Sequence, residues 1–330
     1  MMDNVFISGI TGQDGIFLTH NLLKNNKSLK VYGTSRNVDK SFYKKLNYLD
    51  SNIDFSRVQI LQADLTQHDT VNELLKFIKP TKVFNLSGPS SPSESFSKGK
   101  YFESTINTIF DNLLTVATSL NNDIVFFQPS SSETYSNLNK GPLDESSLME
   151  PRSPYGYAKY KVYLKCLKFK KERGFDIRNG ILFNHESEFR ENKFLIMKII
   201  DSAIKIKSGD LNKLELGSLE YIRDWSHASD VTNAMVKIAY DSFSTDYVVG
   251  TGTGHKIKDI VDIVFDYFNL NYEDHIEVNT YLLRPDDPIS IVSEPLKIMT
   301  KLGWKPKISF EETILKCINF KVHERFKYEG

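Results

Sequence analysis

The sequence is poor in the residues that mark several common classes of protein. Only two of its 330 residues are cysteines, Cys166 and Cys317, and they lie far apart in helical-looking segments. Neither has the spacing of a metal site or a redox pair, which favours two small core residues in a reducing compartment. The seven histidines show no metal-ligand spacing either. We therefore predict no metal site.

The chain also lacks an excess of charge of one sign and any long apolar run. Lysine plus arginine and aspartate plus glutamate both number 42, so no global field attracts nucleic acid or an anionic membrane surface. No segment reaches the roughly 18 apolar residues of a membrane span. The N-terminus, MMDNVFISG, has neither the basic nor the apolar stretch of a signal peptide. These absences predict a cytoplasmic globular protein with no nucleic-acid or membrane partner.

What the sequence does contain is an alternation of short apolar runs with amphipathic segments. The runs are rich in β-branched and aromatic residues and lie at 5–9, 30–35, 58–65, 82–88, 124–130, 178–184 and 247–252. Helical periodicity lies between most of them, as in Val71, Leu74, Leu75 and Ile78. This alternation predicts an α/β fold with a doubly wound, Rossmann-like parallel sheet covered by helices on both faces. Such sheets bind ligands beyond the carboxyl ends of their strands.

The pattern changes after the segment FNHES. A predicted helix at 192–208 is followed by a charged stretch, and the chain then returns to the sheet before a tail of mixed helix and loop. We predict a smaller C-terminal α/β lobe for substrate binding, built from residues 186–224 and 254–330. The NADP-binding Rossmann domain then comprises residues 1–185 and 225–253.

The glycine turn GITGQDG directly follows the first predicted strand and opens a helix. Its spacing lets the backbone pass close to a pyrophosphate, whose charge is then held by amides at the helix N-terminus. The strand before it and the helix after it match the dinucleotide-binding motif. The second strand ends on Arg36 instead of an acidic residue, which favours NADP, with NAD as the alternative. The predicted cofactor-binding residues are Gly9, Thr11, Gly12, Gln13, Asp14, Gly15, Arg36, Asp64, Leu65, Leu86, Ser87, Tyr155 and Lys159.

Tyr155 and Lys159, in the segment PRSPYGYAKYKVY, lie one helical turn apart on the same face of a predicted helix. A nearby ammonium favours phenolate, so we expect Lys159 to lower the pKa of Tyr155 below its usual value of about 10. The pair can then accept a hydroxyl proton while a hydride leaves for a nicotinamide. This spacing is common by chance, but behind a glycine turn and the hydroxyl-rich strand end SSSE it indicates catalysis.

Several motifs follow one another along the chain: GITGQDG, SSSE, YGYAK, NGILFNHES, RDWSH, and RPDDP with KLGWKP. Together they resemble the GDP-mannose 4,6-dehydratases, a family of the extended short-chain dehydrogenase/reductase superfamily. The resemblance covers essentially the whole chain. It implies a lyase that converts a GDP-sugar to a GDP-4-keto-6-deoxy sugar without net consumption of NADP. It also implies a homodimer or homotetramer, with the helices at 99–120 and 154–173 as the usual dimer contact.

The resemblance implies catalytic roles for Ser131, Glu133, Tyr155 and Lys159. Tyr155 would deprotonate the sugar 4-OH, aided by Ser131 and Lys159, as NADP takes the C4 hydride. The ketone makes the C5 proton acidic, and Glu133 would remove that proton and protonate the departing 6-OH before hydride returns to C6. We expect a partly apolar site around Glu133, because such a site suits a carboxyl group that both takes and gives protons.

The resemblance also implies a set of substrate-binding residues. Arg223 and Arg284 would hold the diphosphate and nucleotide, a task that suits planar bidentate cations, and Lys198 would face the guanine. His185 and Arg190 are weaker candidates, because a histidine beside a buried strand is more often a hydrogen-bonded core residue. The full predicted set is Ser90, Asn184, Glu186, Lys198, Arg223, Arg284 and Asp287.

Three positions and one loop depart from the family pattern. Pro89 replaces a glutamine near the sugar, which leaves open a hexose or a heptose. Met197 replaces an arginine beside Lys198, and Ser136 replaces the glycine that usually follows the strand-end tyrosine. The loop after the second strand is shortened to RNVDKSF at 36–42. This leaves open how tightly NADP is bound there and whether a tetramer forms through this loop.

Two other functions also stay open from the sequence. A 4-epimerase, 4-keto reductase or 4-dehydrogenase acting on a GDP-sugar needs Tyr155 and Lys159 but no acid/base at the position of Glu133. A protein that senses NADP(H) without catalysis is expected to lose Tyr155 or Lys159, and both are present.

Overall fold

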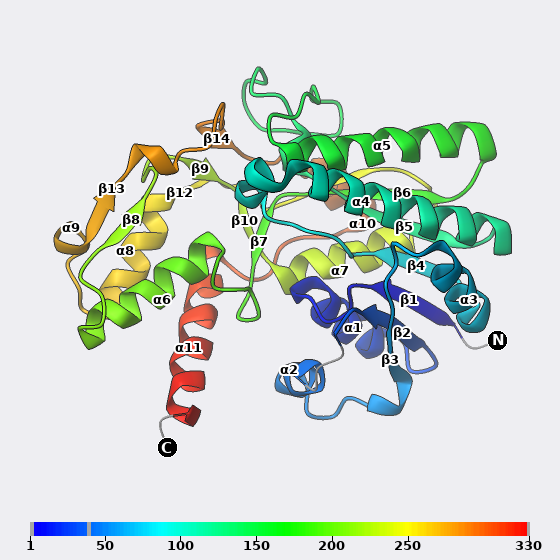
Figure 1. The fold of residues 1–330 in the computed structure, drawn as a ribbon, viewed down its shortest axis with the longest axis horizontal. Coiled ribbons are helices and arrows are strands. Elements are labelled where there is room, and N and C mark those ends of the chain that lie inside the picture. The colour runs from blue at the N-terminus through cyan, green and yellow to red at the C-terminus, as the bar shows by residue number, and fades with distance from the viewer. Residues whose placement is uncertain (1–2, 38–40, 329–330) are drawn as a thin grey trace.

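The computed structural model describes residues 3–37 and 41–328, and its centre is a seven-stranded parallel sheet (Figure 1). The strand order is β11-β6-β5-β4-β1-β2-β3, and the progression along the sheet reverses between β1 and β4. The strands are β1 (Asn4–Ser8), β2 (Lys30–Ser35), β3 (Val58–Gln62), β4 (Lys82–Asn85), β5 (Val125–Ser131), β6 (Ile177–Leu182) and β11 (Tyr247–Val249). The predicted Rossmann-like α/β fold is confirmed, with a strand in each predicted apolar run.

Helices cover both faces of the sheet because successive side chains of a strand point to opposite sides. In β1, Val5 and Ile7 belong to the hydrophobic core on one face and Phe6 to the core on the other. Figure 1 shows α4 and α5 side by side over the face of Phe6. The helices on the face of Val5 are α1 (Gln13–Asn25), α2 (Ser41–Leu49) and α7 (Ala228–Ala239), and those on the face of Phe6 are α3 (His68–Ile78), α4 (Pro92–Leu120) and α5 (Pro154–Arg173).

Three strands, β3, β4 and β11, end three residues before their predicted apolar runs do. The runs at 58–65 and 82–88 continue beyond β3 and β4 as loops. Residues 63–65 and 86–88 of these loops line the cleft described below. These two loops therefore bring both apolar and polar residues to the cleft.

A third hydrophobic cluster lies apart from the central sheet (Figure 1). Its helices are α6 (Leu195–Ser208), α8 (Ile257–Tyr267) and α11 (Phe310–Tyr328). They come from both chain segments that the sequence assigns to the substrate lobe, and α6 begins slightly later than predicted. Met197 of α6 is fully buried in this cluster. The side chain of Met197, which replaces an arginine of the family pattern, therefore packs in a hydrophobic core and does not line the cleft.

Short strands and helices complete the chain. The strands are β7 (Asn184–Glu186), β8 (Leu214–Leu216), β9 (Ile222–Arg223), β10 (Trp225–His227), β12 (His255–Lys256), β13 (Ile276–Val278) and β14 (Ser290–Ile291), and the helices are α9 (Tyr272–His275) and α10 (Leu296–Leu302). Ile298 and Trp304 pack in the core beside α7, although they fall within the segment 254–330 assigned to the lobe. The boundary between the two domains stays a prediction. In the part of the chain that the structure describes, every helix is too short or too polar to cross a bilayer.

Candidate active site

One cleft of about 1100 Å³ follows the carboxyl ends of the central strands and extends into the second lobe. It contains every residue that the sequence predicts as a cofactor, catalytic or substrate residue, from Gly9 in the first turn to Asp287 in the tail. Ligands of doubly wound sheets bind at this edge. The structure thus brings the predicted site residues together, although their individual roles stay predictions.

The turn between β1 and α1 forms one end of the cleft. Gly9 has a φ of +70°, which favours glycine. A Cβ added at Gly15 would lie 2.4 Å from the carbonyl oxygen of Ile10, so this position admits no side chain without movement of the backbone. Gly12 caps α1 without a side-chain hydrogen bond to the helix. The amides at the start of α1 are therefore available to an anion such as a pyrophosphate.

Charged side chains gather beside this turn. Nε2 of His185 lies 3.1 Å from both carboxylate oxygens of Asp14, and Nε of Arg190 lies 3.3 Å from Oε2 of Glu186. Burial would raise the pKa of Asp14, but the charge and hydrogen bond of His185, with the charge of Arg190, lower it to about 2. Burial would lower the pKa of His185, but Asp14 raises it above its usual value. His185 and Arg190 line the cleft. His185 is also hydrogen-bonded to Asp14 and to the carbonyl oxygen of Phe183, and the roles of both residues stay predictions.

The wall of the cleft fits a dinucleotide cofactor. Oγ1 of Thr34 and Oγ of Ser130 are buried in this wall with no hydrogen-bond partner among the described residues. Buried hydroxyl groups of this kind favour a ligand that supplies the partner. Arg36 is exposed at the end of β2 and lines the same cleft. Residues 38–40 of the loop RNVDKSF lie outside the described residues, so the effect of this short loop on the NADP grip stays a prediction.

Helix α5 places Tyr155 and Lys159 in the cleft. Nζ of Lys159 donates a hydrogen bond to the carbonyl oxygen of Pro129 at 3.1 Å and lies 5.8 Å from the centre of the Tyr155 ring. Burial lowers the pKa of Lys159 to about 8. The prediction that Lys159 lowers the pKa of Tyr155 is wrong in this structure. Burial and then the charge of Glu133 raise the pKa of Tyr155, and the Ser131 side chain only partly opposes them.

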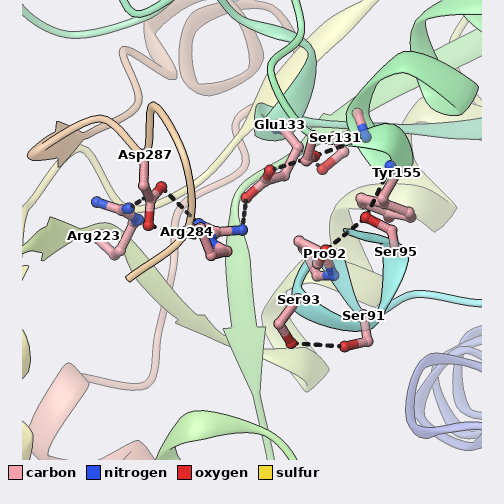
Figure 2. Close-up of polar contacts among 12 residues, drawn as sticks. Ser91, Pro92, Ser93, Ser95, Ser131, Glu133, Tyr155, Arg223, Arg284 and Asp287 are labelled. Carbon is pink, nitrogen blue, oxygen red and sulfur yellow. Dashed lines mark hydrogen bonds and ion pairs between the residues drawn. The ribbon is translucent and has the colours of Figure 1, made fainter. Parts of the chain in front are cut away.

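Glu133 lies on the short 3₁₀ helix η2 (Ser132–Thr134), directly after β5. Its Oε2 accepts a hydrogen bond from Ser153 Oγ at 2.9 Å, and its Oε1 accepts one from Arg284 Nη1 at 2.9 Å (Figure 2). The side chain is 19% exposed, so Glu133 is not a surface acid. A hydroxyl and a guanidinium group contact the two carboxylate oxygens, so the carboxylate itself has polar partners, and the expectation of a partly apolar site around it stays a prediction.

Ser153 is a residue that the sequence analysis missed. It is the N-cap of α5, and its Oγ accepts a hydrogen bond from the amide of Gly156 at 3.0 Å while it donates to Glu133. The carboxylate therefore lies at the N-terminus of the helix that carries Tyr155, where a negative charge is stabilised. The signal was present in the sequence, since a serine before a proline opens a predicted helix there.

Figure 2 shows a chain of ion pairs that continues from Glu133 into the second lobe. Nη2 of Arg284 and Nη2 of Arg223 both donate to Oδ1 of Asp287 at 2.7 Å. Burial lowers the pKa of Arg223. Burial would also lower the pKa of Arg284, but the charges of Glu133 and Asp287 raise it. The structure thus brings together both arginines that the sequence predicts for the diphosphate.

The remaining predicted substrate residues lie around the same cleft. Ser90 and Pro89 belong to the turn between β4 and α4, and Lys198 donates to the carbonyl oxygen of Glu215 at 3.0 Å. Figure 2 shows the serines that follow this turn, of which Ser91 caps α4. Among the side chains that the structure describes, no group of three or more histidine, cysteine or acidic residues is arranged to hold a metal ion.

Comparisons with known proteins agree with this geometry. The family model described as GDP-mannose 4,6 dehydratase matches residues 6–317. The GDP-mannose 4,6 dehydratase 1 of Arabidopsis thaliana is 34% identical over 315 residues, which cover 93% of this chain and 86% of the relative. The GDP-mannose 4,6 dehydratase of Homo sapiens is 30% identical over 335 residues, which cover 95% and 90%.

Two solved structures share the fold. The dTDP-glucose 4,6-dehydratase of Streptomyces venezuelae, solved with NAD bound, has a TM-score of 0.84 at 18% identity over 98% of both chains. The UDP-glucose 4-epimerase of Thermotoga maritima has a TM-score of 0.82 at 18% identity over 98% of this chain and 99% of the epimerase. These two structures support the architecture, and the match to the family model and to the curated relatives identifies the family. The chain therefore belongs to the GDP-mannose 4,6-dehydratase family.

Proposed function

We propose that the protein is a nucleotide-sugar 4,6-dehydratase that converts GDP-mannose, or a close GDP-sugar, to the GDP-4-keto-6-deoxy sugar. The observation that carries this proposal is the position of Glu133 in the same cleft as Tyr155 and Lys159. Tyr155 and Lys159 alone serve oxidation at C4. A carboxylate beside them supplies the group that elimination across C5 and C6 requires.

The chain's own residues divide the proton transfers between them. A nicotinamide cofactor held by the β1–α1 turn supplies hydride acceptance and return. Tyr155 takes the proton of the sugar 4-OH as its phenolate. The Ser131 side chain favours this form, whereas burial and the charge of Glu133 oppose it. Glu133 takes the C5 proton and gives a proton to the 6-OH as it leaves as water. Hydride then returns to C6 and one proton is delivered to C5, which balances the proton that Tyr155 took from the 4-OH, so only water is lost.

We favour NADP over NAD as the cofactor because Arg36 lies at the end of β2, where a cation suits a 2′-phosphate. Arg36→Glu should then weaken NADP binding about tenfold or more while NAD binding changes much less. Equal losses for the two cofactors, measured by fluorescence titration, would contradict this assignment.

We also propose a homodimer through α4 and α5. Apolar side chains on these helices, Tyr101, Tyr157, Leu164 and Leu167, are each at least 39% exposed. A second copy of the chain would cover them. Sedimentation of a monomer at micromolar concentration would contradict this assembly.

The main test is incubation of the protein with GDP-mannose and NADP, followed by mass spectrometry. We expect a product that has lost one water, and Glu133→Gln should reduce its rate of formation by about 10²- to 10⁴-fold. Glu150→Gln is a matched control, because Glu150 also accepts hydrogen bonds from a serine and an arginine, at 2.9 and 3.2 Å, outside the cleft. It should retain activity.

The other outcomes identify the alternatives. A GDP-heptose that reacts while GDP-mannose does not would change the substrate. A product of unchanged mass would indicate a 4-epimerase, and a product two hydrogens lighter, formed with reduced cofactor, a 4-dehydrogenase. Dehydration by Glu133→Gln at the full rate would contradict the role of Glu133.

A further inference from the structure

Arg284 contacts both the predicted acid/base and the predicted phosphate site. Its Nη1 donates to Glu133 at 2.9 Å, while its Nε and Nη2 donate to the two carboxylate oxygens of Asp287 at 3.1 and 2.7 Å. Glu133 and Arg284 come from segments 151 residues apart. A single guanidinium group therefore joins η2 of the Rossmann domain to the loop that follows the 3₁₀ helix η3 (Thr280–Leu282).

The two arginines of the network are held differently. Nη1 of Arg223 donates to the backbone carbonyl oxygens of Ile222 and Ile289, at 2.8 and 3.4 Å, and its side chain is 8% exposed. Every hydrogen bond that Arg284 makes to the described residues goes to a carboxylate side chain, and its side chain is 21% exposed. The backbone fixes Arg223, whereas Arg284 can exchange one carboxylate for another anion.

The charges of the network balance without a ligand's contribution. Glu133 and Asp287 carry two negative charges, and Arg223 and Arg284 carry two positive ones. A diphosphate held by the two arginines adds negative charge to a poorly hydrated site. It would then compete with Glu133 for Nη1 of Arg284, since phosphate and carboxylate bind the same edge of a guanidinium group.

We propose that Arg284 is a positioning residue that couples diphosphate binding to the release of Glu133. The guanidinium group exchanges Oε1 of Glu133 for a phosphate oxygen and remains held by Asp287. Ser153, the N-cap of α5, continues to donate a hydrogen bond to Oε2 of Glu133. The carboxylate therefore stays at the N-terminus of α5 after its Oε1 is released. The acid/base thus becomes available when the diphosphate of a nucleotide sugar is in the cleft. This inference rests on the proposed function.

A double-mutant cycle on GDP binding tests the coupling. The dissociation constant of GDP is measured by calorimetry with the NADP-loaded protein for wild type, Glu133→Gln, Arg284→Gln and the double variant. Glu133→Gln should bind GDP about tenfold more tightly than wild type, because Arg284 no longer has to leave a carboxylate. In the Arg284→Gln background the same change should have much less effect. Arg223→Gln serves as the matched control background, in which the gain should persist.

The outcomes separate this inference from the proposed function. Failure of wild type to bind GDP would overturn both. Binding of GDP with no gain in Glu133→Gln, or with an equal gain in the Arg284→Gln background, would overturn the coupling alone, since an equal gain reflects only the loss of a nearby negative charge.

The lysine variants test the same inference in a charge-conserving form. Arg284→Lys should raise KM and also lower kcat by about tenfold, because a point charge cannot hold Asp287 and phosphate while it releases Glu133. Arg223→Lys should raise KM with little change in kcat. Variants that both raise KM alone would overturn the positioning role of Arg284.

Discussion

At the cofactor end of the cleft the backbone supplies most of the shape, whereas at the substrate end side chains from distant segments supply it. The turn from Gly9 to Gly15 is continuous in sequence, and its form depends on positions where a Cβ has no room. The network of Glu133, Arg284 and Asp287 depends on ion pairs that form only when the two parts of the chain fold together. The first region should therefore be sensitive to added volume and the second to altered charge.

The strongest test of this difference adds one methyl group to the turn. Gly15→Ala places a Cβ 2.4 Å from the Ile10 carbonyl oxygen and 2.6 Å from its backbone carbons, so the turn must move. We expect the free energy of unfolding to fall by about 3 kcal/mol, and cofactor binding to be lost. Urea unfolding and fluorescence titration with NADP measure the two effects.

Gly12→Ala is the control for this variant. Its Cβ would lie 3.3 Å from the Gly9 carbonyl oxygen, and the backbone at Gly12, with φ of −71° and ψ of 166°, suits any residue. We expect a loss of less than about 1 kcal/mol. Equal losses in the two variants would show that glycine at Gly15 is not required by steric contact.

A second variant tests whether the substrate end also depends on close backbone contacts, in addition to its charged side chains. A Cβ at Gly156 would lie 2.2 Å from the carbonyl oxygen of Glu133, so Gly156→Ala must separate η2 from α5. We expect a loss of about 2 kcal/mol in stability. The rate constant kcat should fall by about 100-fold, since a shift of about 1 Å in a catalytic group has an effect of this size.

Gly99→Ala controls for a methyl group added near the same helix. Its Cβ would lie 3.2 Å from Cβ of Pro154, a contact that requires a shift of only a few tenths of an ångström. Alanine also has the higher helix propensity, so stability should change by less than about 1 kcal/mol and kcat should stay the same. If Gly156→Ala retains full kcat, then the close approach of η2 and α5 is not needed for catalysis.

The difference between the two ends also explains what the sequence could predict. The glycine turn and the pairing of Tyr155 with Lys159 follow from local spacing, and the structure places them as expected. Apolar runs predicted all the strands of the central sheet because buried parallel strands are apolar throughout. Local pattern was sufficient wherever the backbone or one helix face determines the geometry.

Properties that depend on tertiary contacts were not predictable in this way. The direction of the pKa shift of Tyr155 is set by burial and by Glu133, a residue on another element. The contact of Glu133 with Arg284 spans 151 residues, and no local spacing encodes it. Met197 faces a hydrophobic core because of how α6 packs against α8 and α11, which a motif comparison cannot reveal.

The smallest expected effect concerns the ion pair between Asp14 and His185 at the cofactor end. The pKa of His185 is raised above 6.5, so its contribution to stability is complete below that pH and is lost as pH rises through the raised value. The pKa of Asp14 is lowered to about 2, so its contribution is present above 3.8 and is lost as pH falls towards 2. Arg190 opposes the charge on His185, and buried Glu186 lies beside Arg190. The pair should therefore stabilise the fold most between these limits.

His185→Asn tests this window by urea unfolding at about pH 5.5, where the imidazole is protonated, and at about pH 9, where it has lost its proton. The variant should be less stable than wild type by about 1–2 kcal/mol at the lower pH, and the difference should shrink at the higher pH. His68→Asn is the control, because the contact of His68 with Asp69 at 3.6 Å is exposed to solvent and screened. A stability difference for His185→Asn that is the same at both pH values would mean that the imidazole acts through packing alone. The cofactor end would then depend on shape throughout, and the contrast with the charged substrate end would be sharper.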